Sequence, residues 1–310
     1  MASPDRTGPT MAANLDFTPM PDFAAATAPC PPAVTAPSPP DGRSIRERAL
    51  AALCETDPVR KAALARSLRA EADTLGDEAL GISQPLNALD PLPGRPDRPV
   101  LVPPQKVERR GSLQSASGRA VLIHALAHIE FNAINLALDA VWRFADMPAA
   151  FYRDWLRVAD EEALHFTLLA AHLGRLGHAY GDFPAHNSLW EMADRTAGDV
   201  LARMALVPRT LEARGLDASP VVRTRLADAG DAEAAAIIDI ILRDEVGHVA
   251  IGNRWYRWLC ERRGLEPVGA YAELAERYKA PKLRPPFNLA ARRQAGFDDD
   301  ELAWLEASAG

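Results

Sequence analysis

Apolar residues recur with helical spacing along most of the chain between residues 117 and 263. From Leu122 onward, apolar positions follow at intervals of three and four residues, as on one face of an α-helix. Four long segments share this pattern, and we predict one helix for each: 117–144, 149–176, 188–214 and 231–263. No segment shows the alternation typical of a strand, so the pattern predicts an all-α fold centred on a bundle of four helices.

The segments outside these helices have different compositions. The N-terminal stretch is dense in proline, alanine, serine and threonine and has no apolar period, which is typical of a disordered tail. A helical pattern then begins near Ser44 and breaks at Asp57, which precedes a proline. The chain therefore divides into four parts: a disordered tail (1–42), a helical and proline-rich N-terminal arm (43–110), the four-helix bundle (111–265) and a C-terminal tail packed on the bundle (266–310).

Two shorter elements are predicted near the end of the chain. Residues 219–228 have the pattern of a short helix that links the third and fourth long helices. We expect the C-terminal tail to consist of a loop and one short helix folded back on the bundle. The proline-rich part of the N-terminal arm, residues 83–110, is expected to run extended over the surface.

Composition narrows the class of protein. The 310 residues are 48% hydrophobic and 25% charged, as in ordinary soluble domains. A net charge of −7 makes a nucleic-acid partner unlikely, and no apolar run is long enough to span a membrane. The three cysteines are too few and too dispersed for a disulfide framework or a zinc site. Because the N-terminus also lacks the apolar core of a signal peptide, we expect a cytoplasmic protein.

Two turns inside the predicted helices combine acids with a histidine. In "DEEALHF", Glu162 and His165 stand three residues apart and share one helix face. In "RDEVGHV", Glu245 and His248 repeat the same ExxH spacing. A carboxylate and an imidazole one turn apart can bind one metal ion from a single rigid element. Oxygen and nitrogen ligands of this kind suit iron or manganese.

Two ExxH turns on facing helices, with one bridging carboxylate from each of the other two helices, would form a dinuclear metal site. The first helix offers Glu130, an acid among apolar neighbours, which lies 32 residues before Glu162. The third helix offers Glu191 and Glu212. Glu212 lies 33 residues before Glu245, whereas Glu191 lies 54 residues before it. The matching steps favour Glu212 as the ligand, with Glu191 as the alternative.

Other polar residues of the helices are interpreted as structural. His124 and His128 stand one turn apart, but the helical phase turns His128 away from Glu130, so we interpret both as packed histidines. Arg209 and Arg243 are candidate charge partners for carboxylates of the site. The sequence leaves these pairings open.

The arrangement resembles the ferritin-like superfamily of carboxylate-bridged diiron proteins. Stretches such as "DWLRVADEEALHFTLL", "YGDFPAHNSLWE" and "ILRDEVGHVAIGNRW" look more specifically like its bacterial DUF455 family. The resemblance implies six metal ligands, namely Glu130, Glu162, His165, Glu212, Glu245 and His248. It also implies that the acid before each ExxH turn orients the histidine of the other turn, so that Asp244 holds His165 and Glu161 holds His248. Asp160 is then expected to face outward.

The resemblance also implies a cofactor of two iron ions, with manganese or a mixed pair as alternatives. The first functional hypothesis is a diiron oxidoreductase that uses O₂ to oxidise or hydroxylate a substrate. Such an enzyme needs a small-molecule or carrier-bound substrate and an electron donor. The second hypothesis is a protein that handles iron or manganese or detoxifies peroxide. The third is a structural helical bundle without a metal.

Overall fold

The computed structural model describes residues 42–88, 91–107 and 111–309, so the tail predicted over 1–42 lies almost wholly outside the described residues. The described residues are all-helical, apart from one isolated β-bridge between Leu101 and Ala185. The N-terminal helices are α1 (Ile45–Cys54), α2 (Pro58–Thr74) and the short 3₁₀ turns Asp77–Leu80 and Pro104–Lys106. The central helices are α3 (Ala116–Arg143), α4 (Ala149–Arg175), α5 (Ser188–Arg195), α6 (Val200–Leu206), α7 (Ala213–Asp228) and α8 (Ala232–Arg263). The C-terminal helices are α9 (Pro267–Arg277), α10 (Leu289–Gln294) and α11 (Asp299–Ser308).

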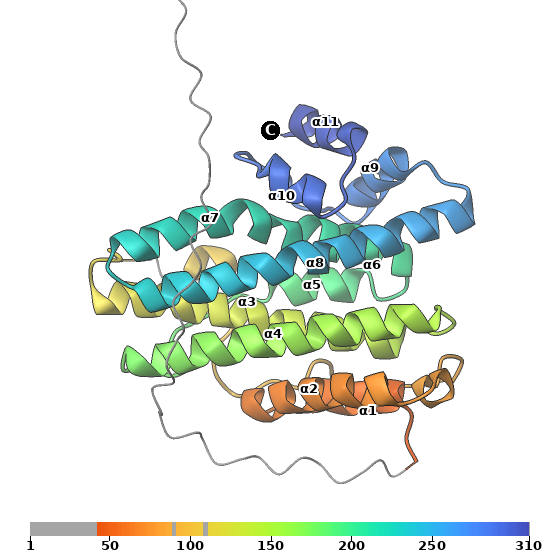
Figure 1. The fold of residues 1–310 in the computed structure, drawn as a ribbon, viewed down its shortest axis with the longest axis horizontal. Helices are drawn as coiled ribbons and strands as arrows, with labels where there is room; N and C mark the ends of the chain where they lie inside the picture. Colours follow the sequence, from red (N-terminus) through yellow and green to blue (C-terminus); the bar gives the residue numbers. More distant parts are fainter. Residues whose placement is uncertain (1–41, 89–90, 108–110, 310) are drawn as a thin grey trace, which may run out of the picture. The chain divides into compact units, whose positions relative to one another are not determined.

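Two pairs of long helices form the centre of the structure (Figure 1). Helix α3 packs along α4, α7 packs along α8, and α4 contacts α8 to join the pairs. Helix α1 covers α3 and α2 covers α4, whereas α9, α10 and α11 lie on the side of α6, α7 and α8. Apolar side chains of all these layers form one large buried core. The site described below lies within this core.

Three of the four long helices begin and end close to their predicted residues. Ser115 caps α3 by accepting a hydrogen bond from the Gly118 amide, and Asp231 caps α8 in the same way. Helix α8 ends at Gly264, whose φ of 63° is a left-handed conformation that glycine adopts without strain. Helix α3 is long and apolar enough to cross a membrane, but 78% of its most apolar 18-residue window is buried inside the protein. Its composition therefore matches that of a core helix.

The single helix predicted over residues 188–214 is wrong. The chain forms α5, leaves the helical path after Arg195, and starts again with α6 at Val200. A π-helical turn, Val207–Glu212, then connects α6 to α7 without a loop, and α7 includes the separate helix predicted over 219–228. The third long element of the core is therefore the run 200–228, and Gly215 lies inside it.

The π turn has local causes in the sequence. Pro208 has no amide hydrogen and interrupts the helical hydrogen-bond ladder at this point. The Thr210 hydroxyl donates to the carbonyl of Ala205, five residues earlier, at 2.9 Å. Gly252 of α8 allows the turn to come close, because a Cβ atom at that position would lie 2.4 Å from the Cβ of Pro208. The wider turn therefore depends both on the proline and on a glycine from another helix.

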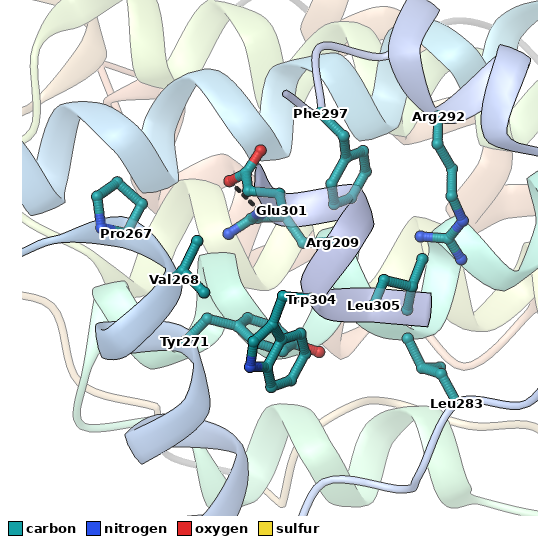
Figure 2. Close-up of a pocket in the computed structure, with 10 residues that line it drawn as sticks. All are labelled: Arg209, Pro267, Val268, Tyr271, Leu283, Arg292, Phe297, Glu301, Trp304 and Leu305. Atoms are coloured by element: carbon teal, nitrogen blue, oxygen red, sulfur yellow. Dashed lines mark hydrogen bonds and ion pairs between the residues drawn. The ribbon is translucent and has the colours of Figure 1, made fainter. Parts of the chain in front are cut away.

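The C-terminal tail contains three short helices where one was predicted, and it docks on the π turn (Figure 2). Arg209 of the turn and Glu301 of α11 form a buried ion pair with an Nη2–Oε1 distance of 2.5 Å. The Arg209 guanidinium lies over the rings of Tyr256 and Phe297, and its Nε donates to Asn253. The tail is short and polar in sequence, and it is held by this long-range pair as well as by local helix propensity.

Replacing Glu301 with glutamine should strongly destabilise the protein. The change leaves the Arg209 charge buried without its carboxylate, and breaking one side of a buried pair typically costs about 3–5 kcal/mol. Glutamine can still accept the Asp298 amide, so the capping box of α11 is retained. Urea denaturation would measure the loss. The matched control is Asp299→Asn, which removes an exposed pair with Arg293 and should cost less than about 1 kcal/mol. Equal effects of the two variants would contradict this role of Glu301.

Candidate metal centre

Glu130, Glu162 and His165 meet in the buried core between α3 and α4. Each offers one ligand atom, and these three atoms lie within 4.8 Å of one another. The His165 Nδ1 atom is 3.5 Å from Glu130 Oε2 and 3.3 Å from Glu162 Oε2. All three side chains are buried. This is the first group of residues that could hold a metal ion.

A second group lies directly beside the first, between α4 and α8. Glu162, Glu245 and His248 also offer ligand atoms within 4.8 Å of one another, and all three are buried. The His248 Nδ1 atom lies 3.0 Å from Glu162 Oε1 and 3.8 Å from Glu245 Oε2. The rings of His165 and His248 are 5.8 Å apart between centroids. The two predicted ExxH turns therefore face each other.

Glu162 belongs to both groups, and its two oxygens face different histidines. Oε2 faces His165 and Oε1 faces His248, which is the arrangement expected of a carboxylate that bridges two ions. The sequence analysis instead gave the bridging positions to the acids of the other two helices, Glu130 and Glu212. Residue spacing does not reveal this difference, because it depends on how the Glu162 side chain is oriented between α4 and α8.

The acids that precede the ExxH turns cross between the helices as expected. His165 Nε2 lies 3.1 Å from Asp244 Oδ2, and His248 Nε2 lies 2.8 Å from Glu161 Oε2. When each Nε2 carries the proton and donates to its carboxylate, each Nδ1 is left with a lone pair that points into the site. Asp160, in contrast, lies 3.2 Å from Arg66 of α2 at the protein surface.

The two acids considered for the third helix have different surroundings. Glu191 is exposed on α5. Glu212, the last residue of the π turn, has a buried Oε2 atom without a hydrogen-bond partner. Burial raises the pKa of Glu212 to about 8, and the nearby charge of Glu162 raises it further. Glu212 therefore faces the other carboxylates, although it does not join either three-residue group.

The electrostatics of the site favour a bound cation. Burial, followed by the charge of Glu162, raises the pKa of Glu130 to about 8. The pKa of Glu245 is also raised well above its usual value for the same two reasons. Burial opposes the charged form of both histidines, but the surrounding carboxylates raise their pKa values above the usual range. These acids therefore retain protons where no cation is present to balance them.

Unpartnered polar atoms point to the same conclusion. Buried oxygens or nitrogens without a hydrogen-bond partner include Glu130 Oε2, Glu162 Oε1, Glu212 Oε2, Glu245 Oε2 and His248 Nδ1. Buried polar atoms are nearly always partnered in folded proteins, so a cluster of five requires an explanation. All five belong to predicted ligands, and carboxylate oxygens with imidazole nitrogens form a donor set suited to iron or manganese. The residues therefore fit a pair of metal ions.

The remaining polar candidates have separate partners. Arg243 pairs with Asp244 at 2.7 Å and so contacts an acid of the site, whereas Arg209 pairs with Glu301 of the tail. His124 and His128 are buried, and burial lowers the pKa of each to about 4. Both are therefore neutral, packed side chains near neutral pH, as predicted.

Comparison with known proteins identifies the family but gives no activity. Residues 54–303 match the family model described as "Protein of unknown function (DUF455)", and this range contains all six predicted ligands. A Haemophilus influenzae protein with the name "Uncharacterized protein" is 51% identical over 223 residues, which cover 70% of this chain and 77% of the relative. No solved structure matches the chain. The extent of the family match and the identity to this relative together show that the chain belongs to the DUF455 family.

Proposed function

We propose that this protein is a non-haem oxidoreductase of the ferritin-like type, whose core holds two iron ions and oxidises a substrate with O₂. The observation that carries the proposal is the pair of facing ExxH turns that share Glu162. Glu130 from α3 and Glu212 from the π turn supply further buried carboxylates beside them. The ligand set would be Glu130, Glu162, His165, Glu212, Glu245 and His248. Manganese or a mixed pair could take the same positions.

The bound ions would supply O₂ activation, and the chain supplies position, charge and protection from water. Glu161 and Asp244 accept the Nε2 protons of the two histidines and thereby aim both Nδ1 atoms inward. The carboxyl groups of Glu130 and Glu212 release protons as cations bind, because their pKa values lie near 8 without them. Complete burial of Glu162 and both histidines keeps bulk water away from the ligands.

Oxidation by O₂ also sets the partners that the proposal requires. When one oxygen atom enters the substrate and the other becomes water, two electrons must come from a donor outside the site. The proposal therefore includes an electron donor and a small-molecule or carrier-bound substrate. Metal content, together with the optical spectrum of the oxidised protein, tests the dinuclear centre directly. O₂ uptake that depends on an added metabolite separates an oxidoreductase from a protein that only handles metal.

Glu162→Ala should lose both metal equivalents, whereas the unaltered chain should bind two. Glu162 is the only residue shared by the two ligand groups, so its removal deletes a ligand from each ion. Anaerobic loading with Fe(II), followed by desalting and metal analysis, measures the stoichiometry. Asp160→Ala is the matched control in the same helical turn and should still bind two. Retention of two ions by Glu162→Ala would contradict the shared-ligand assignment.

The choice between the third-helix acids predicts different results for two variants. Glu212→Ala should lose at least one metal equivalent, because it removes a buried carboxylate that faces the site. Glu191→Ala should keep both ions, because Glu191 is exposed on α5. Metal analysis of the two proteins after identical loading decides between them. The opposite pattern would transfer the ligand role to Glu191.

Asp244→Asn should keep the site but weaken it. An asparagine oxygen can still accept the His165 Nε2 proton, yet it lacks the negative charge that makes the imidazole a stronger ligand. Loss of such a partner typically reduces metal affinity or activity by about 10- to 100-fold. Competition with a chelator measures the affinity. Asp160→Asn, which changes an acid on Arg66, is expected to bind metal as the unaltered protein does. An Asp160→Asn defect as large as that of Asp244→Asn would show that the assigned roles are wrong.

A further inference from the structure

A second cavity lies between the proline-rich segment 95–101, here called the strap, and helix α3. Its volume is about 310 Å³, and its walls include Arg95 and Pro99 of the strap and Phe131 of α3. His128 and Asn132 also line it, and at about 100° per residue each side chain lies about 200° around α3 from Glu130. The body of α3 therefore separates this cavity from the candidate metal centre.

The strap is fixed at several points, so the cavity is present before any ligand arrives. The amide of Val102 donates to the Ala185 carbonyl at 2.8 Å, and the Ala185 amide donates to the Val100 carbonyl at 3.1 Å. At the other end, the Gly94 amide donates to the carbonyl of Leu53 in α1 at 2.9 Å. Preformed cavities of this size are typical of small-molecule sites.

Arg95 gives the cavity an uncompensated positive charge. Its side chain is half-buried and makes no hydrogen bond or ion pair within the described residues. Asp97 also lines the cavity, but it is exposed and forms no ion pair with Arg95. His128 contributes no charge, because burial lowers its pKa to about 4. A half-buried guanidinium without a carboxylate partner is unusual, since desolvating a charge is costly unless it is paired.

A second cation lies behind the wall of the cavity. Lys61 is buried, and its Nζ lies 5.1 Å from the centroid of the Phe131 ring. It donates only to uncharged oxygens, namely those of Leu53, Gly94 and Asn135 at 3.0, 2.7 and 2.6 Å. Burial lowers the pKa of Lys61 to about 7, and repulsion from Arg95 lowers it further. An anion beside Arg95 would relieve this repulsion.

The other walls are suited to the body of a ligand. Phe131 and Pro99 provide apolar surface, and the buried ring of Tyr180 lines the cavity beside them. The Tyr180 hydroxyl lies 2.9 Å from His128 Nδ1, and His128 Nε2 lies 3.1 Å from the His186 carbonyl. Since Nε2 must carry a proton to donate to that carbonyl, Nδ1 accepts from Tyr180. The phenol oxygen then retains a lone pair but offers no donor to the ligand.

We propose that this cavity binds a small anionic molecule, with its carboxylate or phosphate group on Arg95 and its apolar body against Phe131 and Pro99. A guanidinium has two parallel N–H groups that match either kind of anion. The site is separate from the proposed metal centre, and its occupancy does not require a metal.

Calorimetric titration of the full-length chain with benzoate and phenyl phosphate tests the proposal. At least one of these probes should bind saturably with one site per chain. Arg95→Gln should weaken that binding by about tenfold or more, because it removes a charge-assisted contact. Arg95→Lys should retain part of the affinity through its charge. The control variant is Arg98→Gln, since Arg98 is an exposed arginine of the same strap that does not line the cavity.

Three further outcomes decide the proposal. Absence of saturable binding of both probes up to about 10 mM, or equal affinity for the unaltered chain and Arg95→Gln, would overturn it. Benzyl alcohol is the neutral control, and equally tight binding of this alcohol would overturn the anionic assignment. Glu162→Ala should bind the probes normally, so failure of the proposed metal centre and failure of this site can be told apart.

Discussion

The burial of four glutamate carboxylates in one small region of the core is the constraint on which the rest of the structure depends. Ionised carboxylates cannot remain together in a dry interior unless protons or cations balance them, because each unpaired charge costs several kcal/mol. The pKa values near 8 of Glu130 and Glu212 show the proton solution. Two divalent cations would balance four carboxylates and leave both histidines neutral, which is the solution that we propose.

This constraint also explains how the helices are tied together. Glu161 and Asp244 cross between α4 and α8, so the two ExxH turns hold each other in register. The fourth carboxylate comes from a π turn, and Arg209 within that turn is anchored to Glu301 of the C-terminal tail. The tail thus supports the segment that carries Glu212. Distant parts of the chain contribute to one site because no single helix can present all of its ligands.

Much of the fold follows from local sequence. Apolar periodicity and capping residues give α3, α4 and α8 to within a few residues, because these signals lie inside the helices themselves. The third long element could not be predicted in this way. Its π turn requires Gly252 of α8 as well as Pro208, and the polar C-terminal helices are held through partners far away in the chain.

The site divides along the same line. The sequence by itself determined the two ExxH turns and the acids before them, because residues three apart share a helix face whatever surrounds them. It also favoured Glu212 over Glu191 through the spacing of the helices. Only the tertiary structure decided that Glu162 is shared between the two groups, because its two oxygens reach histidines of different helices. The cavity at Arg95 was equally hidden, since a strap and a helix 30 or more residues apart form its walls only after packing.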